Sequence, residues 1–164
     1  MQSSVNTSHT TLVGVGSAHG DDQVGWLVLR EIEPHAPSDI RIVYARTPVD
    51  VLHVPATSRL VVVDSCLGAG AEGTVHHWRW PDVPALVQRP RNSHDWDLFE
   101  VLRLQEMLRP APAASSTPAA AVSVWGIEVA LSQPRQTVAP HLSEALRPAI
   151  RTAALQILGE LCHA

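Results

Sequence analysis

Three side chains of types that can bind divalent metals lie where the chain is expected to leave or enter a strand or helix. Asp22 follows a glycine-rich turn, Asp64 ends an apolar Leu-Val-Val-Val run, and His94 precedes an amphipathic stretch. Two carboxylates and one imidazole form a mixed oxygen and nitrogen donor set suited to Zn, Ni, Mn or a similar ion. Such a set leaves coordination positions open for water or a substrate, so we treat these residues as candidate metal ligands.

Alternating and continuous apolar runs predict the elements that must position these side chains. The first strand ends in Gly14-Val15-Gly16, where glycines allow a sharp bend before a helix that Asp22 begins as its N-cap or next to it. Strands are expected at about 11–16, 40–45, 59–64, 74–80 and 121–129, helices at about 22–33, 96–108 and 140–161, and a helical turn at 49–53. Pro148 is expected to kink the last helix.

The order of these elements predicts a three-layer α/β/α sandwich around a five-stranded, mixed but mostly parallel twisted sheet. The link from Ser65 to Gly73 is too short for a parallel crossover, so the strand near 74–80 should run antiparallel. Each helix that returns between parallel strands starts at the carboxyl edge of the sheet. Asp22, Asp64 and His94 are therefore expected to converge at that edge.

Four segments, in this order along nearly the whole chain, resemble the hydrogenase maturation proteases, the endopeptidases that trim the large subunit of nickel-iron hydrogenases. They are Gly14-Val-Gly with Gly20-Asp-Asp-x-Val-Gly25, Val61-Val-Val-Asp-Ser65, Ser93-His94, and Trp125-Gly-Ile-Glu128. The chain departs from the usual family form in a shorter first turn with Ser17 and in Ala45-Arg46-Thr47-Pro48, where a Gly-Gly-Thr-like segment is common. His19 also stands where the family has no ligand.

The resemblance implies that Asp22, Asp64 and His94 are both the metal-binding and the catalytic residues. It further implies an endopeptidase that removes a C-terminal extension from the nickel-loaded large-subunit precursor, with nickel supplied by that precursor and another divalent metal able to substitute in vitro. A non-catalytic chaperone that checks the precursor for nickel, using the same three residues, is the alternative.

Other interpretations of the same residues are open. Asp22 alone is typical of a helix cap, and Cys66 with His94 suggests a cysteine nucleophile. A nucleotide site is disfavoured because Gly14, Gly16 and Gly20 depart from dinucleotide spacing and Asp21-Asp22 would face the phosphates. His76 and His77 point to opposite faces of one strand, so they cannot bind one ion together, and we interpret both as structural.

Composition narrows the class of protein. The 164 residues fit one domain, expected at 11–164 after a flexible terminus at 1–10. The net charge of -4 and the lack of a basic run argue against nucleic acid, and no apolar run is long enough to span a membrane. Cys66 and Cys162 fit no zinc spacing, which favours a reduced cytoplasmic chain. We expect a monomer whose partner is the precursor.

Overall fold

The computed structural model describes residues 10–54, 59–84, 97–108, 121–130 and 141–162. Its strands are β1 (Thr10–Val15), β2 (Ile40–Ala45), β3 (Arg59–Cys66), β4 (Val75–Arg79) and β5 (Ala121–Glu128). Its α-helices are α1 (Val24–Ile32), α2 (Leu98–Leu108) and α3 (Leu146–Cys162), and short 3-10 helices are η1 (Gly20–Gln23), η2 (Glu33–His35) and η3 (Pro48–His53).

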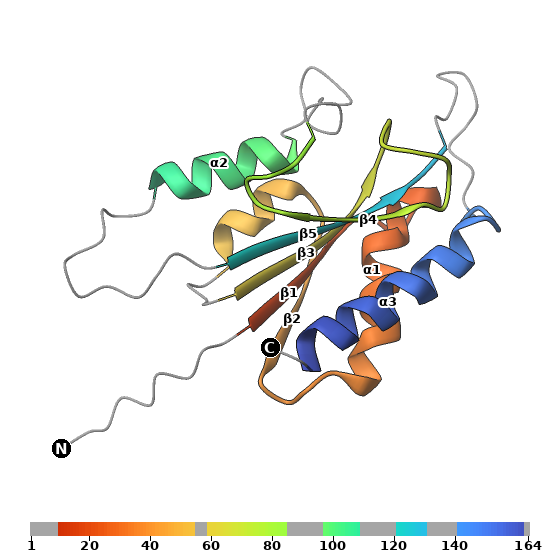
Figure 1. The fold of residues 1–164 in the computed structure, drawn as a ribbon, viewed down its shortest axis with the longest axis horizontal. Helices are drawn as coiled ribbons and strands as arrows, with labels where there is room; N and C mark the ends of the chain where they lie inside the picture. Colours follow the sequence, from red (N-terminus) through yellow and green to blue (C-terminus); the bar gives the residue numbers. More distant parts are fainter. Residues whose placement is uncertain (1–9, 55–58, 85–96, 109–120, 131–140, 163–164) are drawn as a thin grey trace.

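The five strands form one sheet in the order β2-β1-β3-β5-β4. β1 pairs with β2 and β3 in parallel, β3 pairs with β5 in parallel, and β4 is antiparallel to β5. The mixed sheet is confirmed, and so is its physical reason, because the link 67–74 turns the chain straight back without a crossover helix. β4 occupies the edge next to β5 (Figure 1).

Helices cover both faces of the sheet, which gives the expected three layers (Figure 1). α1 and α3 lie on one face, where Val28, Ile150 and Ile157 belong to one apolar core. α2 and η3 lie on the other face, where Val51, Val101 and Leu102 belong to a second core. β3 has side chains in both cores because successive residues of a strand point to opposite faces.

Glycines set the closeness of α1 to the sheet. A Cβ on Gly25, in the first turn of α1, would lie 2.1 Å from the carbonyl oxygen of Val15 and 2.8 Å from that of Val63. A Cβ on Gly14 would lie 2.6 Å from the carbonyl oxygen of Gly25. Gly14 near the end of β1 and Gly25 in α1 are therefore both required for contact between this helix and two strands.

Asp22 lies in η1, next to Gln23, the N-cap of α1, so its expected place at or next to the cap is confirmed. Other expected boundaries were wrong. α3 begins at Leu146, not near 140, so Pro148 falls in its first turn, where a missing N–H breaks no helical hydrogen bond and no kink is needed. Thr10 already belongs to β1. The rest of the flexible terminus expected at 1–10 lies outside the described residues.

None of the helices in the described ranges combines the length and apolar character that crossing a membrane requires.

Candidate active site at the carboxyl edge of the sheet

The turn after β1 holds Asp22 over the carboxyl edge of the sheet. The backbone N–H of Gly16 donates to the carbonyl of Ala45 (3.0 Å), and that of Ser17 donates to the carbonyl of Asp22 (3.2 Å). A Cβ on Gly16 would lie 2.3 Å from the same Asp22 oxygen, so only glycine fits beneath η1. The turn is thus filled by its own backbone, which agrees with the argument against a phosphate cradle.

The two adjacent acids of η1 differ in their surroundings. One carboxylate oxygen of Asp21 accepts a hydrogen bond from the backbone N–H of Ser143 at 2.8 Å, so Asp21 joins η1 to the segment before α3. The Asp22 side chain is exposed, and η1 shows no side-chain capping bond at its N-terminus. Asp21 therefore has a structural contact, whereas the Asp22 carboxylate is accessible to a ligand.

Asp64 lies at the same edge, one strand away. Parallel pairing sets Gly14 opposite Val63, and η1 contacts β3, so the end of β1 and Asp64 are level in the sheet. The Asp64 side chain is half-buried, and one of its oxygens accepts the backbone N–H of Ser65 at 2.7 Å. The carboxyl edge thus holds two of the three predicted ligands. His94 lies outside the described residues, so the complete set of three stays a prediction.

Asp97 marks the start of α2, the element expected to position His94. Its Oδ1 accepts the backbone N–H of Phe99 (3.2 Å), as an N-cap residue does. Among the described residues its Oδ2 has no hydrogen-bond partner. Burial raises the pKa of the Asp97 carboxyl, and the neighbouring Glu100 adds to the shift. An acid that is costly to ionise therefore stands at the start of α2, three residues after His94 in the sequence.

The other departures from the family pattern also lie near this edge. His19 is exposed and precedes η1, and its backbone N–H lies 3.4 Å from the Ser17 hydroxyl. Arg46 and Thr47 precede η3, and both backbone N–H groups donate to one carboxylate oxygen of Asp50, at 2.8 and 3.0 Å. Those bonds lower the pKa of Asp50, with the bond from Thr47 as the largest cause. The Asp50 carboxylate therefore holds this segment in place.

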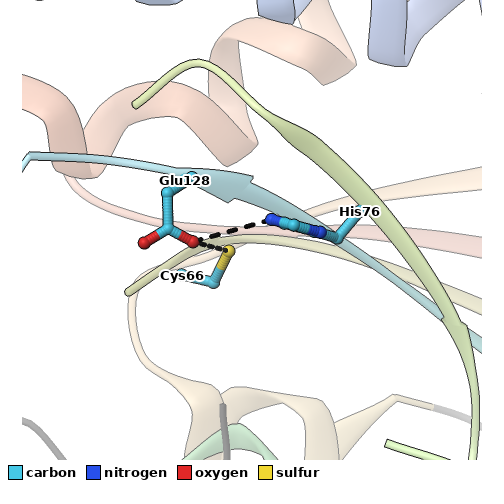
Figure 2. Close-up of side chains that lie close together, drawn as sticks. All are labelled: Cys66, His76 and Glu128. Carbon is cyan, nitrogen blue, oxygen red and sulfur yellow. Dashed lines mark hydrogen bonds and ion pairs between the residues drawn. The ribbon is translucent and has the colours of Figure 1, made fainter. Parts of the chain in front are cut away.

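A second group of side chains includes Cys66, which follows Asp64 by two residues in β3, and the sequence did not predict this group. Cys66, His76 and Glu128 come from β3, β4 and β5 and point toward one another (Figure 2). Both oxygens of Glu128 accept backbone N–H groups of the link after β3, from Gly68 (2.5 Å) and Ala69 (3.1 Å). A carboxylate at the end of a buried strand was the signal used for Asp64, and it applies equally to Glu128.

The fold defines the class of protein: a three-layer α/β/α sandwich with acidic residues at the carboxyl edge of its sheet. Solved structures of hydrogenase maturation endopeptidases have this fold. HybD from E. coli matches with a TM-score of 0.71 and 19% identity over 94% of this chain and 93% of its own. HycI, a NiFe hydrogenase maturation protease from Thermococcus kodakarensis KOD1, matches with a TM-score of 0.65 and 17% identity, over 96% of this chain and 95% of its own. The endopeptidase HycI from Escherichia coli matches with a TM-score of 0.66 and 16% identity, over 92% of this chain and 90% of its own.

Comparison by sequence adds no further relative. No protein-family model matches the chain, and no curated protein matches it. At these identities the structural likeness establishes the fold and its extent, which is nearly the whole chain in each case.

Proposed function

We propose that this protein is an endopeptidase of hydrogenase maturation, which removes a C-terminal extension from the nickel-loaded large-subunit precursor. The observation that carries the proposal is the likeness, over nearly the whole chain, to solved structures named as hydrogenase maturation endopeptidases or proteases. The cytoplasm is the compartment proposed for this step. Both cysteines are thiols rather than halves of a disulfide, in keeping with a reducing compartment.

The geometry of the carboxyl edge supports this chemistry. Asp22 is exposed on η1, and Asp64 is half-buried two residues before the end of β3, so one carboxylate is accessible and the other is held by the sheet. In the proposed reaction both bind the nickel that the precursor brings, together with the imidazole of His94. An ion held in this way polarises the scissile carbonyl or an attacking water. The three residues orient the substrate through its own metal.

The first experiment compares nickel-loaded and nickel-free precursor of the cognate large subunit, with cleavage read as a mass shift. Only the loaded precursor should be cut, and casein should remain intact. Equal cleavage of both precursor forms would remove the role of nickel. Binding of the loaded precursor without any mass shift would favour the chaperone alternative.

Variants test the residues. Asp64→Asn and His94→Ala should each slow processing by more than the roughly 10 to 100-fold that losing a residue behind a metal ligand costs, because a ligand itself is lost. Asp39→Asn is the matched control, since Asp39 is an exposed acid before β2, at the opposite edge. Full activity of both variants combined with an inactive Cys66→Ala would contradict metal recognition by Asp64 and His94 and favour the cysteine nucleophile.

A further inference from the structure

The Cys66, His76 and Glu128 group has the composition of a metal site that differs from the predicted one. It combines a thiol, an imidazole and a carboxylate, and one ligand atom of each lies within 4.8 Å of the other two. Cys66 is 7% exposed and Glu128 is 3% exposed, and the His76 side chain is 17% exposed. Sulfur and imidazole nitrogen favour a softer divalent ion, such as zinc, over magnesium or calcium.

A thiol hydrogen bond from Cys66 to Glu128 and an ion-pair contact from His76 to Glu128 bring the three side chains to separations that metal coordination also requires. Cys66 Sγ lies 3.4 Å and His76 Nε2 lies 3.6 Å from the same Glu128 oxygen, Oε2. Bonds of about 2.3 Å to sulfur and about 2.0 Å to oxygen or nitrogen, at tetrahedral angles, separate the ligand atoms by about 3.3 to 3.5 Å. The two separations from Glu128 are therefore close to the edges of a zinc tetrahedron, and the ligand atoms of Cys66 and His76 lie within 4.8 Å of each other.

His76 Nε2 is a buried atom without a hydrogen-bond partner among the described residues. A buried polar atom left unpaired costs free energy, so its direction toward Glu128 calls for a physical reason. Stacking of the His76 ring on Trp78, with centroids 5.1 Å apart, fixes the plane of the imidazole. A metal ion bound by Nε2 would satisfy the atom in the orientation that the ring already has.

Two glycines keep space around the group. Gly126 lies opposite His76 in the pairing of β4 with β5, and a Cβ there would lie 2.9 Å from Cys66 Sγ and 2.6 Å from the Trp78 ring. A Cβ on Gly70 would lie 3.4 Å from His76 Nε2. The sulfur and the imidazole can thus approach each other across a strand without a side chain between them.

We propose that Cys66, His76 and Glu128 bind one zinc-class ion, which ties the link 67–74 to the ends of β3 and β5. Cys66 gives its thiol proton to solvent and binds as the thiolate, and His76 binds through Nε2. Glu128 binds through Oε2, while its Oε1 keeps the bond from the Gly68 N–H. Three protein ligands leave the fourth position to water. The ion is resident in the protein and separate from the nickel of the proposed substrate.

Cobalt(II) added to the full-length reduced protein provides the test, because a cobalt-thiolate bond gives a charge-transfer absorption that oxygen and nitrogen ligands do not. The wild type should develop this band with about one ion per chain. Cys66→Ser should abolish the band, and His76→Gln should weaken cobalt affinity at least about tenfold. Cys162→Ser is the matched control and should keep the band, since Cys162 is exposed at the end of α3.

Further measurements keep the outcome unambiguous. Circular dichroism establishes that each variant is folded, and zinc should raise the unfolding midpoint of the wild type and of Cys162→Ser but not of Cys66→Ser. Asp64→Asn should keep the cobalt-thiolate band even where processing is lost, which separates this site from the proposed protease site. Absence of the band in the wild type, or its persistence in Cys66→Ser, would overturn the proposal.

Discussion

Gly25→Ala should be among the most damaging single-methyl changes in this chain. The added Cβ would lie 2.1 Å from the carbonyl oxygen of Val15 and 2.8 Å from that of Val63, and 3.0 Å from the backbone nitrogen of Val15. These atoms belong to two central strands, so they cannot rotate away as the end of a side chain can. α1 itself must move away from β1 and β3.

The size of the effect follows from the distance. Real Cβ contacts essentially never fall below 3.0 Å, so α1 must shift by at least the 0.9 Å that separates 2.1 from 3.0 Å. Overpacking a close-packed interior costs about 1 to 3 kcal/mol. Because the contacts are with backbone atoms, we expect the free energy of unfolding to fall by an amount at or above the upper end of that range. Alanine's better helix propensity returns only about 1 kcal/mol and does not offset this loss.

The matched control is Gly159→Ala in α3, where a Cβ would meet no atom within 4 Å. That variant should gain about 0.5 to 1 kcal/mol from helix propensity alone. Denaturant unfolding of both variants measures the difference, which should reach at least about 3 kcal/mol with opposite signs relative to the wild type. A Gly25→Ala variant within about 0.5 kcal/mol of the wild type would refute the argument from close backbone contact.

The same displacement should affect the carboxyl edge. η1 ends at Gln23, directly before α1, so a shift of α1 moves the turn that carries Asp22. The Gly25→Ala variant should therefore process the precursor more slowly than the loss of folded protein alone explains. Gly159→Ala should keep the wild-type rate of processing.

Two further predictions concern pH and are checked by urea unfolding between pH 3 and pH 7. Asp50→Ala should lower the free energy of unfolding at neutral pH by about 0.5 to 1 kcal/mol, because two backbone N–H groups lose an acceptor close to solvent. The folded pKa of Asp50 lies below 3.8, so this contribution is present above that pH and is lost as pH falls through the lowered value; an undiminished difference in acid would contradict it. The folded pKa of Asp97 is raised by burial, so its contribution is present below 3.8 and is lost as pH rises through the raised value. Asp97→Asn keeps a cap acceptor and should flatten that pH dependence, whereas unchanged curvature would show that Asp97 does not cause it.

Local sequence determined the sheet and one of its acids. The apolar run before Asp64 predicted a central strand, which continues two residues past Asp64 to Cys66, and the short link after it required β4 to be antiparallel. Both follow from the chain itself, because alternation and link length are properties of consecutive residues. The boundaries of α1 and α3 were predicted less well, since the 3-10 turn η1 and the start of α3 at Leu146 depend on contacts such as that of Asp21 with Ser143.

Only the tertiary structure decided which distant residues share a site. His76 was interpreted as structural and Glu128 as part of a motif, because periodicity does not say that β4 lies beside β5 or that Cys66 pairs with Glu128. Strand register places these side chains against one another, and register is settled by the packing of the whole sheet. The role of Gly25 has the same origin: the chain shows a glycine in a helix, and only the contact with Val15 and Val63 shows why no larger residue fits.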